Sequence, residues 1–533
     1  MNIYALCFLV ILFFNIFKNR KSLHMLQQNL YNENNRYVKW ILKNLKSVFL
    51  SIDLLAVITL LIAYVLDNDI SKILVTIAIV FYILDIVSNL NNDKEKAKQT
   101  KKKLVVTKRV KRLIVTISIL LMLPIVIYLL DREQFLLVVF IESIITYLNY
   151  VLVLIAKIIN TPVEKMVYKY YELKAKDKLK SMSNLKVIGI TGSYGKTSSK
   201  NILNDILNFK YITKPSPKNL NTEYGLMITI NNYIDKFDEV FIAEMGAYKQ
   251  GEIKKLCNLV HPKYGILTTI GLAHLETFGS PEKIQKTKFE LIESLPSDGI
   301  AVLNKDDPKQ VSYNIKSECK KVWIGIKSKD ADVVASDITC DYQGSKFNVT
   351  FKGDSTKYPF ETKLLGDYNI YNILAGIALG REFGISVQDL QQAVKKVRAV
   401  EARLELKDFG YMYQINDAYN SNPIGAKMAL DVLNTMPGHK VVVTPGMVEL
   451  GEKEKELNHI FGTQIAKVAD TVILVGAKRT RPIFDGLRQS GYNKDKLYVV
   501  NNVYEAYNLL QSMQTKEKVY ALFENDLPDT YNE

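Results

Sequence analysis

The chain has 533 residues and a formal net charge of +15, a length that predicts three to four domain-sized units. Ten Lys and Arg residues stand against two acids in residues 91–112, but long apolar stretches flank this run, so it is read as a loop between membrane helices and no nucleic-acid partner is expected. The four cysteines have no metal-ligand spacing, which argues against a zinc site and a disulfide framework.

Residues 1–160 predict a transmembrane anchor of about five helices. Three of the five apolar stretches reach the length of about 20 residues that a spanning helix needs, and two are shorter. A cleaved signal peptide is not expected, because the first stretch has no basic segment before it and no small-residue exit. A buried soluble helical domain is the alternative. The stretches are Ile3–Phe17, Val48–Leu66, Ile73–Val87, Leu113–Leu130 and Phe135–Ala156, of which the first and third are the short ones.

The loops between these stretches alternate in charge. Residues 18–46, residues 93–112 and the region after Lys157 are basic, whereas the other two loops are short and acidic. Since basic loops face the cytoplasm, the pattern predicts a multi-pass protein of the cell membrane with cytoplasmic catalytic domains. Asp53, Asp85 and Glu142 lie within the stretches. We interpret them as lying near helix ends or paired between helices, rather than as an ion path.

A glycine loop between a strand and a helix follows a linker at residues 161–182. Leu185–Ile190 is a short apolar run of strand type, and a helical pattern begins at Ser198. The segment between them reads Thr191-Gly-Ser-Tyr-Gly-Lys-Thr197. This is the context of a phosphate-binding loop, although Ile190 stands where the standard pattern has its first glycine. A tight turn with an idle lysine is the alternative.

Each residue type in this loop suits a nucleoside triphosphate. Backbone N–H groups at Gly192, Ser193 and Gly195 would approach phosphate oxygens at the start of the helix. Lys196 would neutralise the β- and γ-phosphates, and the hydroxyl of Thr197 would ligate Mg²⁺. The expected cofactors are therefore ATP and Mg²⁺.

The shortened loop resembles the phosphate loop of the Mur ligase family and of the related folylpolyglutamate and poly-γ-glutamate synthetases. The similarity continues along residues 183–460 and is nearest to the D-Ala-D-Ala-adding (MurF-like) members. The segments that carry it are Pro217–Gly225, Glu244–Ala247, Thr268–Ser280, Asn304–Asp307, Gly366–Asn372, Glu401–Arg403, Asp417–Pro423 and Gly446–Gly451.

The resemblance implies an α/β fold after the N-terminal transmembrane helices. Residues 183–395 would form a P-loop ATPase domain on a parallel sheet, and residues 396–533 a smaller, Rossmann-like C-terminal domain. It also implies an ADP-forming ligase. A carboxylate attacks the γ-phosphorus of ATP to give an acyl phosphate, and an amine then attacks the acyl carbon and releases phosphate.

The resemblance further implies roles for residues beyond the loop. Glu244 and His274 would hold metal ions with Thr197, and Lys288 would carry a carbamate that steadies the second metal; Lys286 and an ordinary surface lysine are the alternatives. Asn304, Asp307, Asn369 and Asn372 resemble positions around the adenine and ribose. Arg403 and Asp417 would reach the γ-phosphate from the C-terminal domain, and Asn420 and Asn422 would line the entry of the amine substrate.

Three features depart from the family. Tyr368 replaces a histidine, residues 1–160 stand where a soluble domain that grips a uridine nucleotide is usual, and Glu524 follows the last strand-like run, Val519–Phe523, where the family has a basic segment. The expected partners are therefore a membrane lipid bilayer, a carboxylate acceptor that is lipid-linked or polymeric, and an amino acid or dipeptide. A poly-γ-glutamate-type ligase and a non-catalytic membrane scaffold are the alternatives.

Overall fold

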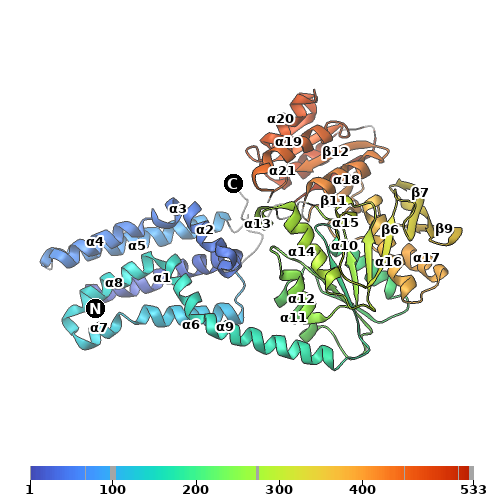
Figure 1. Cartoon of the computed structure of the whole chain (residues 1–533). Helices are drawn as coiled ribbons and strands as arrows, with labels where there is room; N and C mark the ends of the chain where they lie inside the picture. The colour runs from blue at the N-terminus through green and yellow to red at the C-terminus, as the bar shows by residue number, and fades with distance from the viewer. Residues whose placement is uncertain are drawn as a thin grey trace. The chain divides into compact units, whose positions relative to one another are not determined.

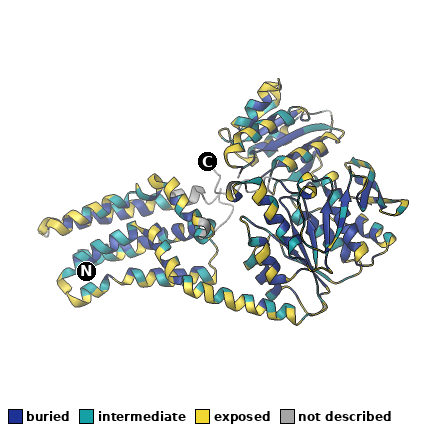
Figure 2. Cartoon of the chain, in the orientation of Figure 1, coloured by how far each residue is buried: buried dark blue, intermediate teal, exposed yellow. Residues whose placement is uncertain are grey.

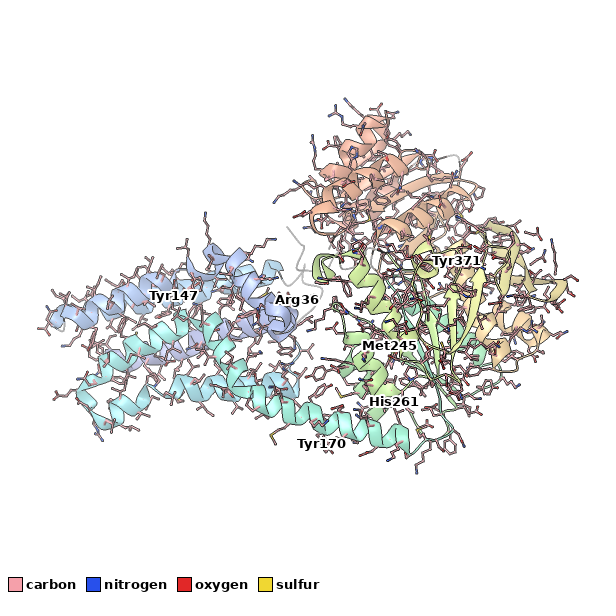
Figure 3. All side chains as sticks on the ribbon, viewed as in Figure 1. Arg36, Tyr147, Tyr170, Met245, His261 and Tyr371 are labelled. Atoms are coloured by element: carbon pink, nitrogen blue, oxygen red, sulfur yellow. The ribbon has the colours of Figure 1, made fainter. Side chains whose placement is uncertain are left out.

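The computed structural model divides the chain into two compact units, Met1–Lys169 and Tyr170–Leu527 (Figure 1). It describes residues 2–66, 68–96, 104–271, 275–419, 421–448, 450–513, 515 and 517–526. The chain passes from the first unit to the second within one helix, α9 (Asn149–Lys180), on which Tyr170 is labelled in Figure 3. Most of the expected linker at residues 161–182 is thus the continuation of the last apolar stretch.

The described part of the first unit is helical. Its long helices carry buried apolar side chains on one side and exposed ones on the other (Figure 2). The elements are α1 (Ile3–Gln28), η1 (Leu30–Asn35), α2 (Arg36–Lys43), α3 (Leu45–Phe49), α4 (Asp53–Leu66), α5 (Asp69–Lys96), α6 (Lys108–Met122), α7 (Ile125–Leu130), η2 (Arg132–Gln134) and α8 (Phe135–Tyr147), followed by α9.

The helices differ in length from the apolar stretches. Within the described residues, three are long and apolar enough to cross a membrane: Ile3–Gln28, Asp69–Leu90 and Lys108–Leu130. A fourth candidate, Arg132–Tyr147 with Asn149–Lys180, is bent by 83° at its break. The stretch Val48–Leu66, expected to span, yields only the 14-residue α4, which is about 21 Å long and shorter than a bilayer core. By length and composition the described residues thus contain three candidate spans, or four with the bent pair, beside the prediction of about five.

A network of polar side chains lies inside the first unit. Lys18 of α1 forms an ion pair with Asp53 at the start of α4, and both side chains are buried. Asn15 of α1 donates hydrogen bonds to Thr146 Oγ1 (2.7 Å) and Glu142 Oε1 (3.4 Å) of α8. Two of the three buried acids thus pair between helices, as the sequence indicated.

Breaking the Lys18–Asp53 pair is expected to destabilise the first unit by about 3–5 kcal/mol, because Lys18→Met leaves an uncompensated buried carboxylate. Unfolding of detergent-solubilised protein is followed by the fluorescence of Trp40 in a Trp323→Phe background, which leaves Trp40 as the single tryptophan. The matched double variant Lys18→Met/Asp53→Asn should regain much of the lost stability. A single variant as stable as the parent would show that the pair contributes nothing.

The second unit contains a nine-stranded sheet in the order β2-β3-β1-β4-β5-β6-β7-β8-β9. Strands β2 to β7 are parallel, and β7, β8 and β9 form an antiparallel extension. The strands are β1 (Lys186–Thr191), β2 (Thr213–Pro215), β3 (Val240–Glu244), β4 (Tyr264–Leu267), β5 (Ile300–Asn304), β6 (Lys320–Gly325), β7 (Val333–Asp341), β8 (Gly344–Phe351) and β9 (Asp354–Thr362).

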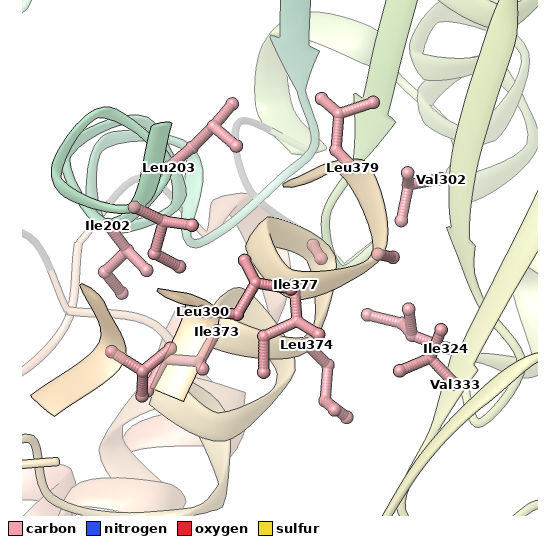
Figure 4. Close-up of a cluster of buried hydrophobic side chains, with 14 of the residues drawn as sticks. Ile202, Leu203, Val302, Ile324, Val333, Ile373, Leu374, Ile377, Leu379 and Leu390 are labelled. Carbon is pink, nitrogen blue, oxygen red and sulfur yellow. The ribbon is translucent and has the colours of Figure 1, made fainter. Parts of the chain in front are cut away.

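Helices cover this sheet and bury its parallel strands (Figure 2). The main core joins Ile202 and Leu203 of α10 to Ile373 and Leu374 of α16 and to strand residues such as Val302 (Figure 4). Helices α12 and α14 contact β1, and α14 also contacts β4. The helices are α10 (Lys196–Leu207), α11 (Glu223–Asn232), α12 (Glu252–Val260), α13 (Leu275–Phe278), α14 (Pro281–Glu293), α15 (Pro308–Val311), α16 (Asp367–Glu382) and α17 (Val387–Lys395).

A second sheet of six strands follows, in the order β10-β11-β15-β12-β13-β14. All its neighbours are parallel except β10 and β11, which agrees with the expected Rossmann-like domain. The elements are β10 (Glu405–Asp408), β11 (Met412–Asp417), α18 (Pro423–Asn434), β12 (His439–Thr444), η3 (Gly451–Lys453), α19 (Glu454–Ile465), β13 (Thr471–Val475), α20 (Arg481–Gln489), η4 (Lys494–Lys496), β14 (Leu497–Val500), α21 (Val503–Ser512) and β15 (Val519–Glu524).

Candidate active site

The glycine loop joins β1, an interior strand of the first sheet, to the start of α10. Gly192 and Gly195 have φ values of 151° and 81°, which L side chains rarely adopt. A Cβ on Gly192 would lie 1.9 Å from Thr268 Oγ1, and one on Gly195 would lie 2.1 Å from Tyr368 Oη. The loop therefore packs too closely for side chains at either position. Tyr368, which replaces the family's histidine, packs against this loop.

Lys196 is folded back onto the loop that precedes it. Its Nζ donates hydrogen bonds to the carbonyl oxygens of Gly192 (2.8 Å) and Ser193 (3.1 Å). Burial lowers the pKa of Lys196 to about 8, against the opposing charge of Glu244 and with a further decrease from Arg403. Among the described residues no carboxylate is hydrogen-bonded to this half-buried ammonium group, which suits it to an incoming anion such as a phosphate.

Glu244 ends β3 and is held by three side chains from other elements. The Thr197 hydroxyl lies 3.1 and 3.2 Å from its two carboxylate oxygens. Asn221 Nδ2 donates to Oε1 at 2.9 Å, and Lys200 Nζ lies 2.9 Å from Oε2. Burial opposes ionisation of Glu244, but Lys200, Asn221 and Lys196 lower its pKa below the ordinary value. Met245, the next residue, marks this strand end in Figure 3.

Lys200 and Asn221 are site residues that the sequence reasoning missed. Lys200 is fully buried and also donates to the carbonyl oxygen of Lys218 at 2.7 Å. A signal for it exists, because Lys200 follows Lys196 by one helical turn and shares its face of α10. Asn221 lies within the matched segment 217–225, but its contact with Glu244 depends on the packing of two distant segments.

The pairing of Thr197 with Glu244 fits a magnesium ion. No group of three or more His, Cys, Asp or Glu side chains suited to a metal occurs among the described residues. Mg²⁺ needs only one or two protein oxygens, because it keeps several waters and binds substrate phosphates. Of the other predicted ligands, His274 lies outside the described residues, as does the substrate candidate Asn420; their roles stay predictions.

Lys288 lines the same cavity as the glycine loop. Its side chain is buried, whereas Lys286 on the same helix, α14, is exposed. Burial, with repulsion from Lys196, lowers the pKa of Lys288 well below its ordinary value. A neutral amine is the form that adds to CO₂. This geometry favours Lys288 over Lys286 as the carbamylation candidate.

The cavity brings together residues from both sheets. Ser193, Gly195, Lys196, Thr197 and Glu244 from the first sheet region line it with Lys288 and Asn369. Arg403, Asp417 and Asn422 from the second sheet region line the same cavity. The Arg403 guanidinium lies over the Tyr419 ring, 4.2 Å from its centroid. Asn422 also caps α18 by accepting a hydrogen bond from Gly425 N at 2.8 Å.

The four candidate adenine and ribose residues do not all line the cavity. Asn369 lines the cavity, and the buried Nδ2 of Asn372 has no hydrogen-bond partner among the described residues, which leaves a donor for a ligand. Asn304 and Asp307 are not among the lining residues. Asn304 Oδ1 accepts from Asp306 N (2.9 Å), and Asp307 Oδ2 accepts from Ile270 N (2.8 Å). Their role as nucleotide contacts stays a prediction.

Comparison with known proteins agrees with this arrangement. Residues 190–380 match the Mur ligase middle domain, and residues 402–522 match the Mur ligase, glutamate ligase domain. The UDP-N-acetylmuramoyl-tripeptide–D-alanyl-D-alanine ligase of Bacillus subtilis is 30% identical over 333 residues, which are 62% of this chain and 70% of that protein. The chain belongs to the Mur ligase family. As a Mur ligase, it is an ATP-dependent, ADP-forming enzyme that uses Mg²⁺.

Other Mur ligases support the same assignment. The Escherichia coli ligase of the same name is 32% identical over 55% of this chain and 64% of its own length. MurF from Acinetobacter baumannii superposes with a TM-score of 0.61 at 25% identity, over 68% of this chain and 78% of that chain. MurF from Thermotoga maritima, solved in complex with ADP, superposes with a TM-score of 0.60 at 26% identity, over 67% and 80%. The predicted family and the α/β fold of its ligase domains are therefore confirmed.

Proposed function

We propose that this Mur ligase is a membrane-anchored enzyme that adds an amino acid or dipeptide to a peptidoglycan-type precursor through an acyl phosphate. The observation that carries the proposal is that Lys196, Thr197, Glu244, Arg403 and Asp417 line one and the same cavity. The relatives named above act on UDP-N-acetylmuramoyl-tripeptide and D-alanyl-D-alanine, which makes D-alanyl-D-alanine the first donor to test.

Different side chains of the cavity have different roles in the proposed reaction. ATP supplies the phosphoryl group that activates the carboxylate. Lys196 and Arg403 approach the cavity from opposite sheets and offset the negative charge of the phosphates. Thr197 and Glu244 would hold Mg²⁺ between them, with Lys200 and Asn221 fixing the Glu244 carboxylate. Because Arg403 comes from the C-terminal part of the chain, the complete site requires both sheets to be in place.

The first unit supports the membrane part of the proposal. Its three long apolar helices carry large apolar side chains on their outer surfaces, including Ile73 (62% exposed), Val115 (58%) and Leu129 (74%). Surfaces of this kind suit lipid better than water. An enzyme held in this way would meet acceptors that are lipid-linked or polymeric at the same surface. We therefore propose a membrane-held acceptor in place of a soluble nucleotide-linked one.

The test supplies full-length protein with ATP, Mg²⁺, D-alanyl-D-alanine and one of two acceptors. One acceptor is soluble UDP-N-acetylmuramoyl-tripeptide, and the other is a vesicle preparation carrying the lipid-linked precursor. Phosphate release gives the rate, and mass spectrometry identifies the product. Faster turnover of the vesicle-borne acceptor is expected. Efficient turnover of the soluble acceptor by a fragment without the first unit would refute the membrane-held acceptor, and no phosphate release with either would refute the substrate class.

Lys288→Ala is expected to lower the ligase rate by about 10–100-fold, the usual loss when a group that supports a metal is removed. Acetate or formate should restore part of the rate, because a small carboxylate can occupy the position of the carbamate. Lys286→Ala, two residues away on the exposed face, is the matched control and should leave the rate unchanged. If neither acetate nor formate restored the rate, and added bicarbonate left the wild-type rate unchanged, carbamylation of Lys288 would be contradicted.

A further inference from the structure

The last strand of the second sheet ends on an acid next to Asp417. Strands β11 and β15 are parallel neighbours, and their register pairs Asp417 directly with Glu524. Paired residues on adjacent strands project their side chains to the same face of the sheet. Two carboxyl groups therefore stand side by side at the strand ends that border the cavity.

The two acids have different surroundings. Asp417 lines the cavity, and its Oδ1 accepts a hydrogen bond from Leu404 N at 3.2 Å. Glu524 is 1% exposed and is not among the residues that line the cavity. Its Oε1 accepts from the Ser421 hydroxyl at 2.6 Å, but its buried Oε2 has no hydrogen-bond partner among the described residues. A buried carboxylate oxygen left without a donor is costly, so this oxygen requires a proton or a ligand.

The charges around the pair decide which acid carries the proton. Burial and the neighbouring Asp417 raise the pKa of Glu524 well above its ordinary value. Burial raises the pKa of Asp417 to about 6, against the attraction of Arg403 and the hydrogen bond from Leu404 N. Tyr368 lines the same cavity, and the charges of Arg403 and Asp417 both act on its hydroxyl group. Burial and the charge of Asp417 both favour the protonated form of Glu524, and in that form its Oε2 can donate a hydrogen bond to Asp417.

The amide-forming step needs a proton acceptor at this wall. An α-amino group has an ordinary pKa of about 7.7–8.0, so a donor amine arrives largely as ammonium, without the lone pair that attacks the acyl carbon. A base works best when its pKa is near the working pH. Asp417 is the ionised carboxylate that both lines the cavity and belongs to the second sheet.

We propose that Glu524 is a positioning residue that donates its proton in a hydrogen bond to Asp417 and so presents the Asp417 carboxylate to the ammonium group of the amine donor. This inference rests on the proposed ligase function. In the step, one N–H bond of the ammonium breaks, its electron pair stays on nitrogen and the proton forms an O–H bond with Asp417. The free amine then attacks the acyl carbon. The C–O bond to phosphate breaks, and the second proton that the nitrogen must lose to become an amide leaves with the departing phosphate.

The experiment compares two nucleophiles at pH 7.5 with full-length protein, ATP, Mg²⁺ and the faster of the two acceptors used above. D-alanyl-D-alanine must lose a proton before it attacks. Hydroxylamine is largely unprotonated at this pH, so its attack on the acyl phosphate, measured as hydroxamate, needs no base. Glu524→Leu should lower amide formation by about 10-fold or more and leave hydroxamate formation within about 2-fold.

Three variants separate positioning from packing. Glu524→Gln keeps an N–H donor toward Asp417 and should recover most of the amide formation that Glu524→Leu loses. In Glu524→Leu the acidic limb of the amide pH profile should move upward from about pH 6, because Asp417 loses a hydrogen bond that favours its charged form. Asp526→Asn, an exposed acid two residues on, should leave the profile in place.

The outcomes distinguish this inference from the ligase function. Equal loss of amide and hydroxamate in Glu524→Leu, an unmoved pH limb, or a Glu524→Gln variant as slow as Glu524→Leu would each overturn the positioning role. If the wild-type protein forms neither product and no ADP, the proposed function itself fails. If the wild-type protein forms hydroxamate but no amide, the acyl-phosphate step is supported and D-alanyl-D-alanine is not the amine donor.

Discussion

Lys196→Met is expected to lower the rate of ATP-dependent amide formation by about 10³-fold or more. The lysine is the cationic side chain of the glycine loop, and its Nζ donates hydrogen bonds to the Gly192 and Ser193 carbonyl oxygens. Removing a preorganised charge from the site of phosphoryl transfer costs about 10²–10³ or more in rate. The measurement is ADP formation at saturating ATP and acceptor.

The same variant is not expected to unfold more easily. Burial already opposes the charged form of Lys196, whose pKa falls to about 8, and methionine fills similar space without a charge to desolvate. An unchanged melting temperature with a 10³-fold lower rate would therefore place the effect in the chemistry. A variant that keeps more than about a tenth of the wild-type rate would show that Lys196 does not contact the reacting phosphates.

The ATP-binding part of the fold was predictable because its signals are local. The run Leu185–Ile190 and the glycine loop after it predict a strand, a turn and a helix. Strand β1 is shifted by one residue from the predicted run, and α10 begins two residues before the predicted Ser198. The run Val519–Phe523 likewise became β15. Buried parallel strands read as continuous apolar segments, so their positions could be found without tertiary information.

The contacts of the site were less predictable because they join distant segments. Lys200 pairs with Glu244 across 44 positions in the chain, and Asp417 meets Glu524 only through the register of β11 and β15. The sequence identified Glu524 as a departure from the family but not its position against Asp417. Strand order and register depend on the packing of the whole sheet, which no local pattern reports.

The helices of the first unit differ in their limits from the apolar stretches for a related reason. Helix α1 continues from the apolar residue Phe17 to Gln28, because polar residues such as Lys18 find buried partners on neighbouring helices. Conversely, the stretch Val48–Leu66 divides where the Ser51 hydroxyl and Asp53 interact at the start of α4. Hydropathy counts apolar residues and therefore misses both effects.

Arg403→Ala is expected to lower the maximal rate by about 10³–10⁵-fold, the range for an arginine that stabilises a transferring phosphoryl group. Arg403 is a cation that the second sheet region places in the cavity wall facing the glycine loop. Since the other nucleotide candidates that line the cavity belong to the first sheet region, the KM for ATP should change much less than the maximal rate. Steady-state kinetics over a range of ATP concentrations measures both.

Two further variants test why the residue is an arginine. The planar guanidinium lies over the Tyr419 ring at 4.2 Å, and a lysine ammonium can neither stack in this way nor bind phosphate oxygens bidentately. Arg403→Lys should therefore stay within about 10-fold of Arg403→Ala. Tyr419→Leu keeps the charge but removes the surface that orients it, and should cost about 10-fold, in line with a cation–π interaction of about 1–2 kcal/mol. If Arg403→Lys were as fast as the parent, charge alone would suffice, and the contact with Tyr419 would have no part in orienting Arg403.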